Sequence, residues 1–252
     1  GKTVQQNEIH SRIGAKYSDR LGRKAGDIVK LVYYDMSTAF GLQANDVNSI
    51  VIEAPNQFEK FLIELHASIE EKEDYFALYD DADDKLDLHK TGDIIISPFD
   101  LSFDKREVQK KLYSELDEIM FNEGFQEEFA SIRGKLLGML DKIREVSDYD
   151  LESEDEFDST ALFRLYDMHI ANPKGRFDEK LIEYIITMKK LTGKNFFTVA
   201  NCESFLTPDS YKHLAKCAKY YDICIVFLSN RQIELLKDKN TYIIDMDLCE
   251  IH

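Results

Sequence analysis

A dense run of carboxylates lies at residues 148–158 (DYDLESEDEFD), where seven of eleven side chains are acidic and none is basic. Ca²⁺ is a hard cation that takes several oxygen ligands in flexible geometry, and such a run supplies them. Without a cation the charges repel one another and favour a solvated loop. Both interpretations stay open from these residues alone. The candidate metal ligands are Glu152, Glu154, Asp155, Glu156 and Asp158.

Basic residues recur in clusters along the chain. Lys212, Lys216 and Lys219 fall at i, i+4 and i+7 of a helix predicted over residues 208–221, so they share one helical face. A solvated face explains any single cluster, whereas several together favour a surface that binds phosphates without reading bases. The other candidate phosphate contacts are Lys105, Arg106, Lys110, Lys111, Arg133, Lys135, Lys189 and Lys190.

The overall charge opposes a nucleic-acid partner. The chain carries 32 basic and 48 acidic residues, a formal net charge of −16. Phosphate binding needs a basic surface, so this balance alone favours an alternative function, an acidic DNA mimic or regulator that binds a nucleic-acid enzyme.

Motifs for common chemistry are missing from the sequence. It contains no GxxxxGK[ST] phosphate loop, GxGxxG, GxSxG elbow or HExxH, so we expect a protein without enzymatic activity. The four cysteines form no CxxC and are expected to be reduced thiols in a cytoplasmic protein. No apolar run approaches 18 residues, and therefore no membrane span is predicted.

The elements that must position these residues follow from hydrophobic periodicity. Apolar β-branched runs predict strands that alternate with helices over residues 56–71 and 208–221, which is typical of a mostly parallel sheet in an α/β fold. The strand candidates are residues 31–34, 49–53, 75–79, 94–96, 196–201, 223–229 and 241–246.

The middle of the chain has a helical period and no convincing strand. We therefore predict one α/β head domain from residues 30–103 and 192–252, with a long α-helical leg from residues 104–191 inserted in it. Residues 1–29 are polar and are interpreted as an N-terminal extension or a remnant of an expression vector.

Several segments in a fixed order carry a family resemblance over about residues 29–252. They are IVIE (50–53), SPFDLSFDKREVQKKLY (97–113), DLESEDEFD (150–158), ALFRLYDM (161–168), FFTVANCESFLTPDSYKHL (196–214) and ICIVFLSNRQIE (223–234). With them the chain resembles the small accessory adaptation protein of type II-A CRISPR systems.

The resemblance implies a homotetrameric ring that binds double-stranded DNA ends through a lysine-lined hole, with Ca²⁺ supporting the leg. It implies a head similar to a P-loop core that has lost its nucleotide site. It also implies no catalytic activity, and a role in spacer acquisition beside the integrase and effector nuclease of the system. Asp155 and Glu156 match the family's acidic segment. A ring would place lysines of four subunits inside while carboxylates face outward, which reconciles the acidic net charge with DNA binding.

Overall fold

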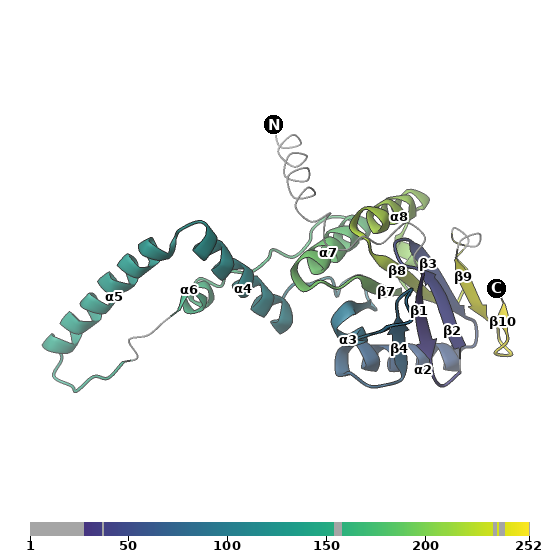
Figure 1. The fold of residues 1–252 in the computed structure, drawn as a ribbon, viewed down its shortest axis with the longest axis horizontal. Coiled ribbons are helices and arrows are strands. Elements are labelled where there is room, and N and C mark those ends of the chain that lie inside the picture. The colour runs from purple at the N-terminus through teal and green to yellow at the C-terminus, as the bar shows by residue number, and fades with distance from the viewer. Residues whose placement is uncertain (1–27, 37, 154–157, 234–235, 237–239, 252) are drawn as a thin grey trace. The chain divides into compact units, whose positions relative to one another are not determined.

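The computed structural model describes residues 28–36, 38–153, 158–233, 236 and 240–251. The chain divides into two compact units. We call the described residues of 28–98 and 194–251 the sheet unit, and residues 99–193 the helical unit. Figure 1 shows their elements.

A six-stranded sheet forms one layer of the sheet unit, in the order β10-β9-β3-β8-β7-β6. All neighbours pair in parallel except β10 with β9. The strands β3, β7 and β8 are buried along their whole length, as expected for a parallel sheet covered on both faces. The predicted α/β fold with a mostly parallel sheet is thus confirmed. The strands are β3 (Val47–Ile52), β6 (Gly92–Ile95), β7 (Phe196–Ala200), β8 (Cys224–Ser229), β9 (Thr241–Ile244) and β10 (Glu250–Ile251).

A second, antiparallel sheet of order β2-β1-β4-β5 completes this unit. Aromatic rings join it to the helix α2 (Pro55–His66): Tyr33 stacks on Phe76 at 4.4 Å, and Phe61 meets Tyr33 edge-on at 4.9 Å. These residues belong to one continuous hydrophobic core with both sheets. The strands are β1 (Ile28–Tyr33), β2 (Thr38–Gln43), β4 (Phe76–Tyr79) and β5 (Lys85–Leu86).

β1 begins inside the segment that we predict to be an N-terminal extension. Residues 1–27 lie outside the described residues, but Ile28 and Val29 belong to β1 although we assigned them to the extension. Val29 and Leu31 are buried while Lys30 between them is exposed. This alternation is that of a half-buried strand, and β1 begins two residues before the predicted start of the head domain at residue 30.

The helix predicted over residues 56–71 is not uniform. α2 gives way to a short π-helix (Ala67–Glu71), which ends where Lys72 adopts the left-handed conformation at φ 65°. Two further short helices, α3 (Leu88–Thr91) and a 3₁₀ turn (Glu203–Phe205), and the helix α8 (Pro208–Tyr221) complete the sheet unit.

The helical unit interrupts the chain between β6 and β7, which are neighbours in the sheet with Gly92 opposite Phe196. Gly124 separates its two long helices at φ 76°, a left-handed value that glycine adopts without strain. Its described residues contain no strand, and none of the described helices is long and apolar enough to cross a bilayer. Its helices are α4 (Arg106–Asn122), α5 (Gln126–Val146), α6 (Ser159–Leu165) and α7 (Phe177–Thr192).

Candidate nucleic-acid interface

A groove of about 750 Å³ lies in the helical unit between residues of α4 and α6. Arg106 and Lys110, two of the predicted phosphate contacts, line it one helical turn apart on the same face of α4. Arg164 contributes a third cation from α6. The remaining lining residues are Gln109, Tyr113, Ser114, Asp117 and Thr160.

Two contacts hold α6 against α4. The ring of Phe163, which is buried, lies 6.0 Å from that of Tyr113, centroid to centroid. Ser159, the first residue of α6, donates a hydrogen bond to Asp117 Oδ1. Asp158 caps the helix by accepting a hydrogen bond from the Ala161 backbone N–H at 2.8 Å, which satisfies one of the free donors of its first turn.

The start of α4 is fixed by a polar cluster. Asn172 Oδ1 accepts the backbone N–H of Phe103 at 2.8 Å, and its Nδ2 donates to Asp104 Oδ2 at 3.0 Å. Hydrogen bonds from Ser102 and Asn172 lower the pKa of Asp104 below its ordinary value, because they stabilise its charged form. The segment that leads into Arg106 is therefore anchored, and so is the first turn of α4.

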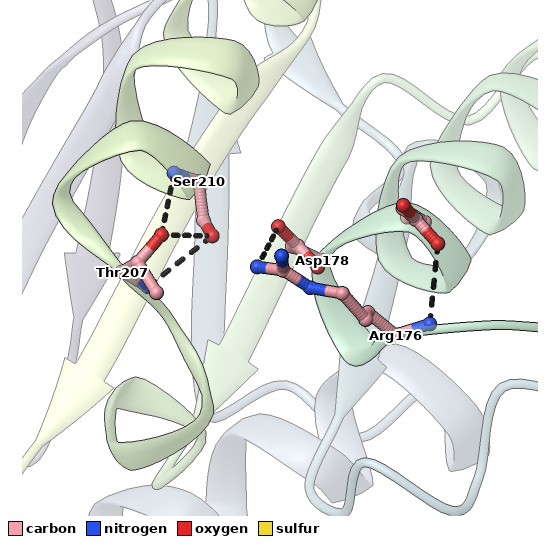
Figure 2. Close-up of polar contacts among 5 residues, drawn as sticks. Arg176, Asp178, Thr207 and Ser210 are labelled. Atoms are coloured by element: carbon pink, nitrogen blue, oxygen red, sulfur yellow. Dashed lines mark hydrogen bonds and ion pairs between the residues drawn. The ribbon is translucent and has the colours of Figure 1, made fainter.

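The start of α7 is also anchored by side chains. The backbone N–H of Arg176 donates to Glu179 Oε2 at 3.2 Å, and its guanidinium meets Asp178 Oδ2 at 3.1 Å. Figure 2 includes this ion pair.

The electrostatics of the groove favour an anion. Within the described part of the chain, no carboxylate lies within 4.0 Å of the charged nitrogens of Arg106, Lys110 or Arg164. Among the described residues of the lining, Asp117 is the single acidic side chain, and it already accepts the Ser159 hydroxyl. Cations held near one another without carboxylate partners attract a multiply charged anion.

The second basic surface is the exposed face of α8 in the sheet unit. Tyr211 and Leu214 point into the core, and Tyr211 meets the β8 ring of Phe227 at 5.1 Å. Thr207 and Ser210 form a capping box, in which each side chain accepts the other's backbone N–H at 3.2 Å (Figure 2). The opposite face, with the three predicted lysines, is therefore directed outward.

Those three lysines differ in their partners. Lys212 pairs with Asp209 at 3.0 Å and lowers that carboxyl's pKa, and Lys219 pairs with Asp46 at 3.4 Å. Lys216 has no ion-pair partner among the described residues. Both bridges are exposed on the lysine side, and such pairs contribute at most about 1 kcal/mol, so a phosphate can replace the carboxylate.

The other predicted contacts do not form one site. Lys111 is exposed on α4 outside the groove, and Arg133 and Lys135 lie on α5. Lys105 is the N-cap residue of α4, while Lys189 and Lys190 lie in the last turn of α7 and already have interaction partners. Arg164 is missed from the sequence because it has no basic neighbour in the chain. Tertiary packing alone places it beside the basic residues of α4.

Two of the five predicted metal ligands lie among the described residues. Glu154, Asp155 and Glu156 lie outside the described residues. Glu152 and Asp158 are exposed, and Asp158 serves as the cap of α6. Among the residues the structure describes, no three His, Cys, Asp or Glu side chains are grouped closely enough to hold a metal ion.

The end of β3 leaves little room for a phosphate loop. β3 ends at Ile52 and α2 begins at Pro55, so only Glu53 and Ala54 connect them. A glycine-rich loop that wraps phosphates with its backbone amides needs a longer connection at this edge of a parallel sheet. The sheet unit therefore lacks a phosphate cradle after this strand.

The chain is similar to solved structures to different degrees. Stu0660 of Streptococcus thermophilus superposes with a TM-score of 0.55 at 13% identity, covering 85% of this chain and 74% of that one. A nucleotide-free ATP-binding cassette of an ABC transporter gives a TM-score of 0.41 at 13% identity, covering 89% and 90%. No curated protein sequence matches the chain.

A family model described as CRISPR-associated protein (Cas_Csn2) matches residues 68–248. This range includes most of the sheet unit, the whole helical unit and both basic surfaces. The chain therefore belongs to the CRISPR-associated Cas_Csn2 family.

Proposed function

We propose that this protein binds double-stranded DNA ends without sequence preference, as a Ca²⁺-stabilised homotetrameric ring in the cytoplasm. In this role it takes part in spacer acquisition, together with the integrase and effector nuclease of its CRISPR system. It acts by binding rather than by catalysis. The observation that carries the proposal is membership of a CRISPR-associated family, to which the basic surfaces add a means of holding phosphates.

The two basic surfaces suit backbone rather than base recognition. Lysine and arginine side chains on helix faces reach phosphate oxygens, which position a protein on a duplex but carry no sequence information. The face of α8 and the groove of α4 and α6 each offer three cations. In a closed ring, the copies contributed by four subunits would add up to a strongly positive interior, although the chain carries −16 overall.

Ca²⁺ is proposed to bind the acidic segment. The donors fit the ion chemically, since Glu152, Glu154, Asp155, Glu156 and Asp158 offer only carboxylate oxygens, which Ca²⁺ prefers. When bound, the ion neutralises charges that otherwise repel one another just before α6. Because Asp158 also caps α6, an ion held by this carboxylate would be linked directly to the helix that carries Arg164.

Band-shift assays with linear and covalently closed circular duplexes of the same sequence test this function. The proposal predicts that Ca²⁺ promotes a shift of the linear duplex and that the circle is not shifted, because threading needs a free end. Equal binding of both forms would contradict end recognition. Failure to bind either form at low salt, with or without Ca²⁺, would favour the acidic-mimic function instead, for which the net charge of −16 is the supporting observation.

A further inference from the structure

The groove between α4 and α6 carries more positive charge than contact with one backbone phosphate requires. We propose that it is a binding site for a phosphate monoester, and that its ligand is the 5′-terminal phosphate of a DNA end. This inference rests on the proposed function and deepens it. A free mononucleotide has the same chemistry, and the experiment below distinguishes the two sources.

The charge balance of the groove matches a dianion. Among the described lining residues, Arg106, Lys110 and Arg164 supply three positive charges and Asp117 supplies one negative charge, so two net positive charges remain. A phosphate monoester carries between one and a half and two negative charges at neutral pH, since its second pKa is about 6. An internal phosphodiester carries a single charge and would leave the groove unbalanced.

The donors surround the groove from two helices. Each arginine presents a planar fork of N–H groups that matches phosphate oxygens, and Lys110 adds a point charge. Tyr113, Ser114 and Thr160 also line the groove, and within the described residues no hydrogen bond engages their hydroxyls. A terminal phosphate has three oxygens that bear no second ester, so it can accept from α4 and α6 together.

The size of the groove fits a chain terminus. Its volume of about 750 Å³ lies within the range of sites that enclose small ligands. An internal phosphate is flanked by nucleotides on both sides, whereas a terminal one enters a two-walled groove with only one sugar behind it. The contacts of Phe163 with Tyr113 and of Ser159 with Asp117 keep both walls in place.

Equilibrium binding of two short duplexes tests the inference. They have the same sequence and differ only in a 5′-phosphate or a 5′-hydroxyl. We expect the full-length protein to bind the phosphorylated duplex about tenfold more tightly at pH 7.5, because several charge-assisted hydrogen bonds are added. The preference should shrink at pH 5, where most of the monoester has taken up one proton and carries a single negative charge.

Variants locate the effect. Arg164→Ala and Lys110→Ala should each abolish most of the preference, while Lys111→Ala, on α4 outside the groove, should leave the ratio of the two affinities unchanged. Cooperative urea unfolding of each variant shows that it is folded. Equal affinity of the parent protein for the two duplexes would overturn the inference and leave the proposed DNA binding intact.

Calorimetry with a nucleoside monophosphate separates the two sources. If the protein binds no duplex but takes up the monophosphate, and Arg164→Ala abolishes that binding, the ligand is a free nucleotide. The monoester site then stands, and DNA as its source is overturned together with the proposed function. If neither duplex nor monophosphate binds at low salt, both the site and the function are overturned.

Discussion

The hydroxyl of Ser159, at the first position of α6, donates a hydrogen bond to the carboxylate of Asp117 on α4. The bond is buried on the Ser159 side and tethers the short helix that carries Arg164. It also occupies the one carboxylate that lines the groove beside the three cations among the described residues. The same contact thus supports both the packing and the charge of the proposed phosphate site.

Removal of this bond should destabilise the protein modestly. Ser159→Ala leaves a charged acceptor without its partner, and we expect the free energy of unfolding to fall by about 1–2 kcal/mol. Ser114→Ala, an exposed change in the same groove, should cost less than about 0.5 kcal/mol. Urea unfolding measures both values, and equal costs would show that the Ser159 hydroxyl contributes nothing to stability.

The lysine face of α8 should contribute to the salt dependence of DNA binding. Replacement of Lys212, Lys216 and Lys219 by Ala should weaken duplex binding and reduce the slope of log K against log salt by up to about three, roughly one per lost phosphate contact. Lys90→Ala is a matched control, since Lys90 is an exposed lysine of the sheet unit with a similar ion pair, to Asp87 at 3.2 Å. An unchanged slope in the triple variant would exclude this face from the interface.

Tyr33 should make stability fall at alkaline pH. Burial has the larger effect in raising the pKa of the Tyr33 phenol. The hydrogen bond that this phenol donates to Glu64 Oε2 at 2.5 Å raises the pKa further. The folded state therefore keeps a proton that an unfolded tyrosine loses near pH 10, and the stabilisation is complete below that pH and declines above it.

Urea unfolding of Tyr33→Phe at neutral and alkaline pH checks this effect. Near pH 7 the free energy of unfolding of the variant should be about 1–3 kcal/mol lower than that of the parent protein, because Glu64 loses its donor. Between pH 9 and about pH 11 this free energy should decrease less in the variant than in the parent protein. Tyr75→Phe, at a partly exposed position, serves as the control and should behave as the parent does. A parallel alkaline decline in both variants would refute the assignment to Tyr33.

The cysteines should react in a defined order. Cys202, Cys217 and Cys224 are buried, and burial raises the pKa of Cys217 to about 11, whereas Cys249 is exposed. A thiol-specific reagent at pH 7.5 should therefore modify one thiol of the native protein quickly, because the thiolate is the nucleophile and must be accessible. Cys249→Ser should remove this fast phase, and a remaining fast phase would place an accessible thiol elsewhere.

The parallel sheet and α8 can be predicted from the sequence because short stretches of neighbouring residues determine them. β7 and β8 are continuous β-branched and aromatic runs, and Thr207-Pro208 marks the start of α8, which begins at Pro208. The groove escapes sequence reasoning because Arg164 and Lys110 are distant in the chain. The packing of Phe163 near Tyr113 and the hydrogen bond from Ser159 to Asp117 bring α6 to α4, and no periodic pattern encodes these contacts.

Removal of Ca²⁺ should change the assembly. The proposal predicts a tetramer by light scattering in the presence of Ca²⁺ and a smaller species with a chelator, because uncompensated carboxylates at residues 148–158 then repel one another. Asp155→Asn combined with Glu156→Gln should give the smaller species even with Ca²⁺. A molecular mass that is the same with Ca²⁺ and with the chelator would show that Ca²⁺ does not stabilise the assembly.

The most direct test of the account is a titration of a fluorescent linear duplex with the full-length protein and Ca²⁺ at increasing salt. If the protein binds DNA through its basic surfaces, the affinity should be measurable at about 50 mM salt and should fall steeply toward about 200 mM, as counterions compete for the phosphates. Absence of binding at the lowest salt, or an affinity that does not vary with salt, would contradict the proposed function.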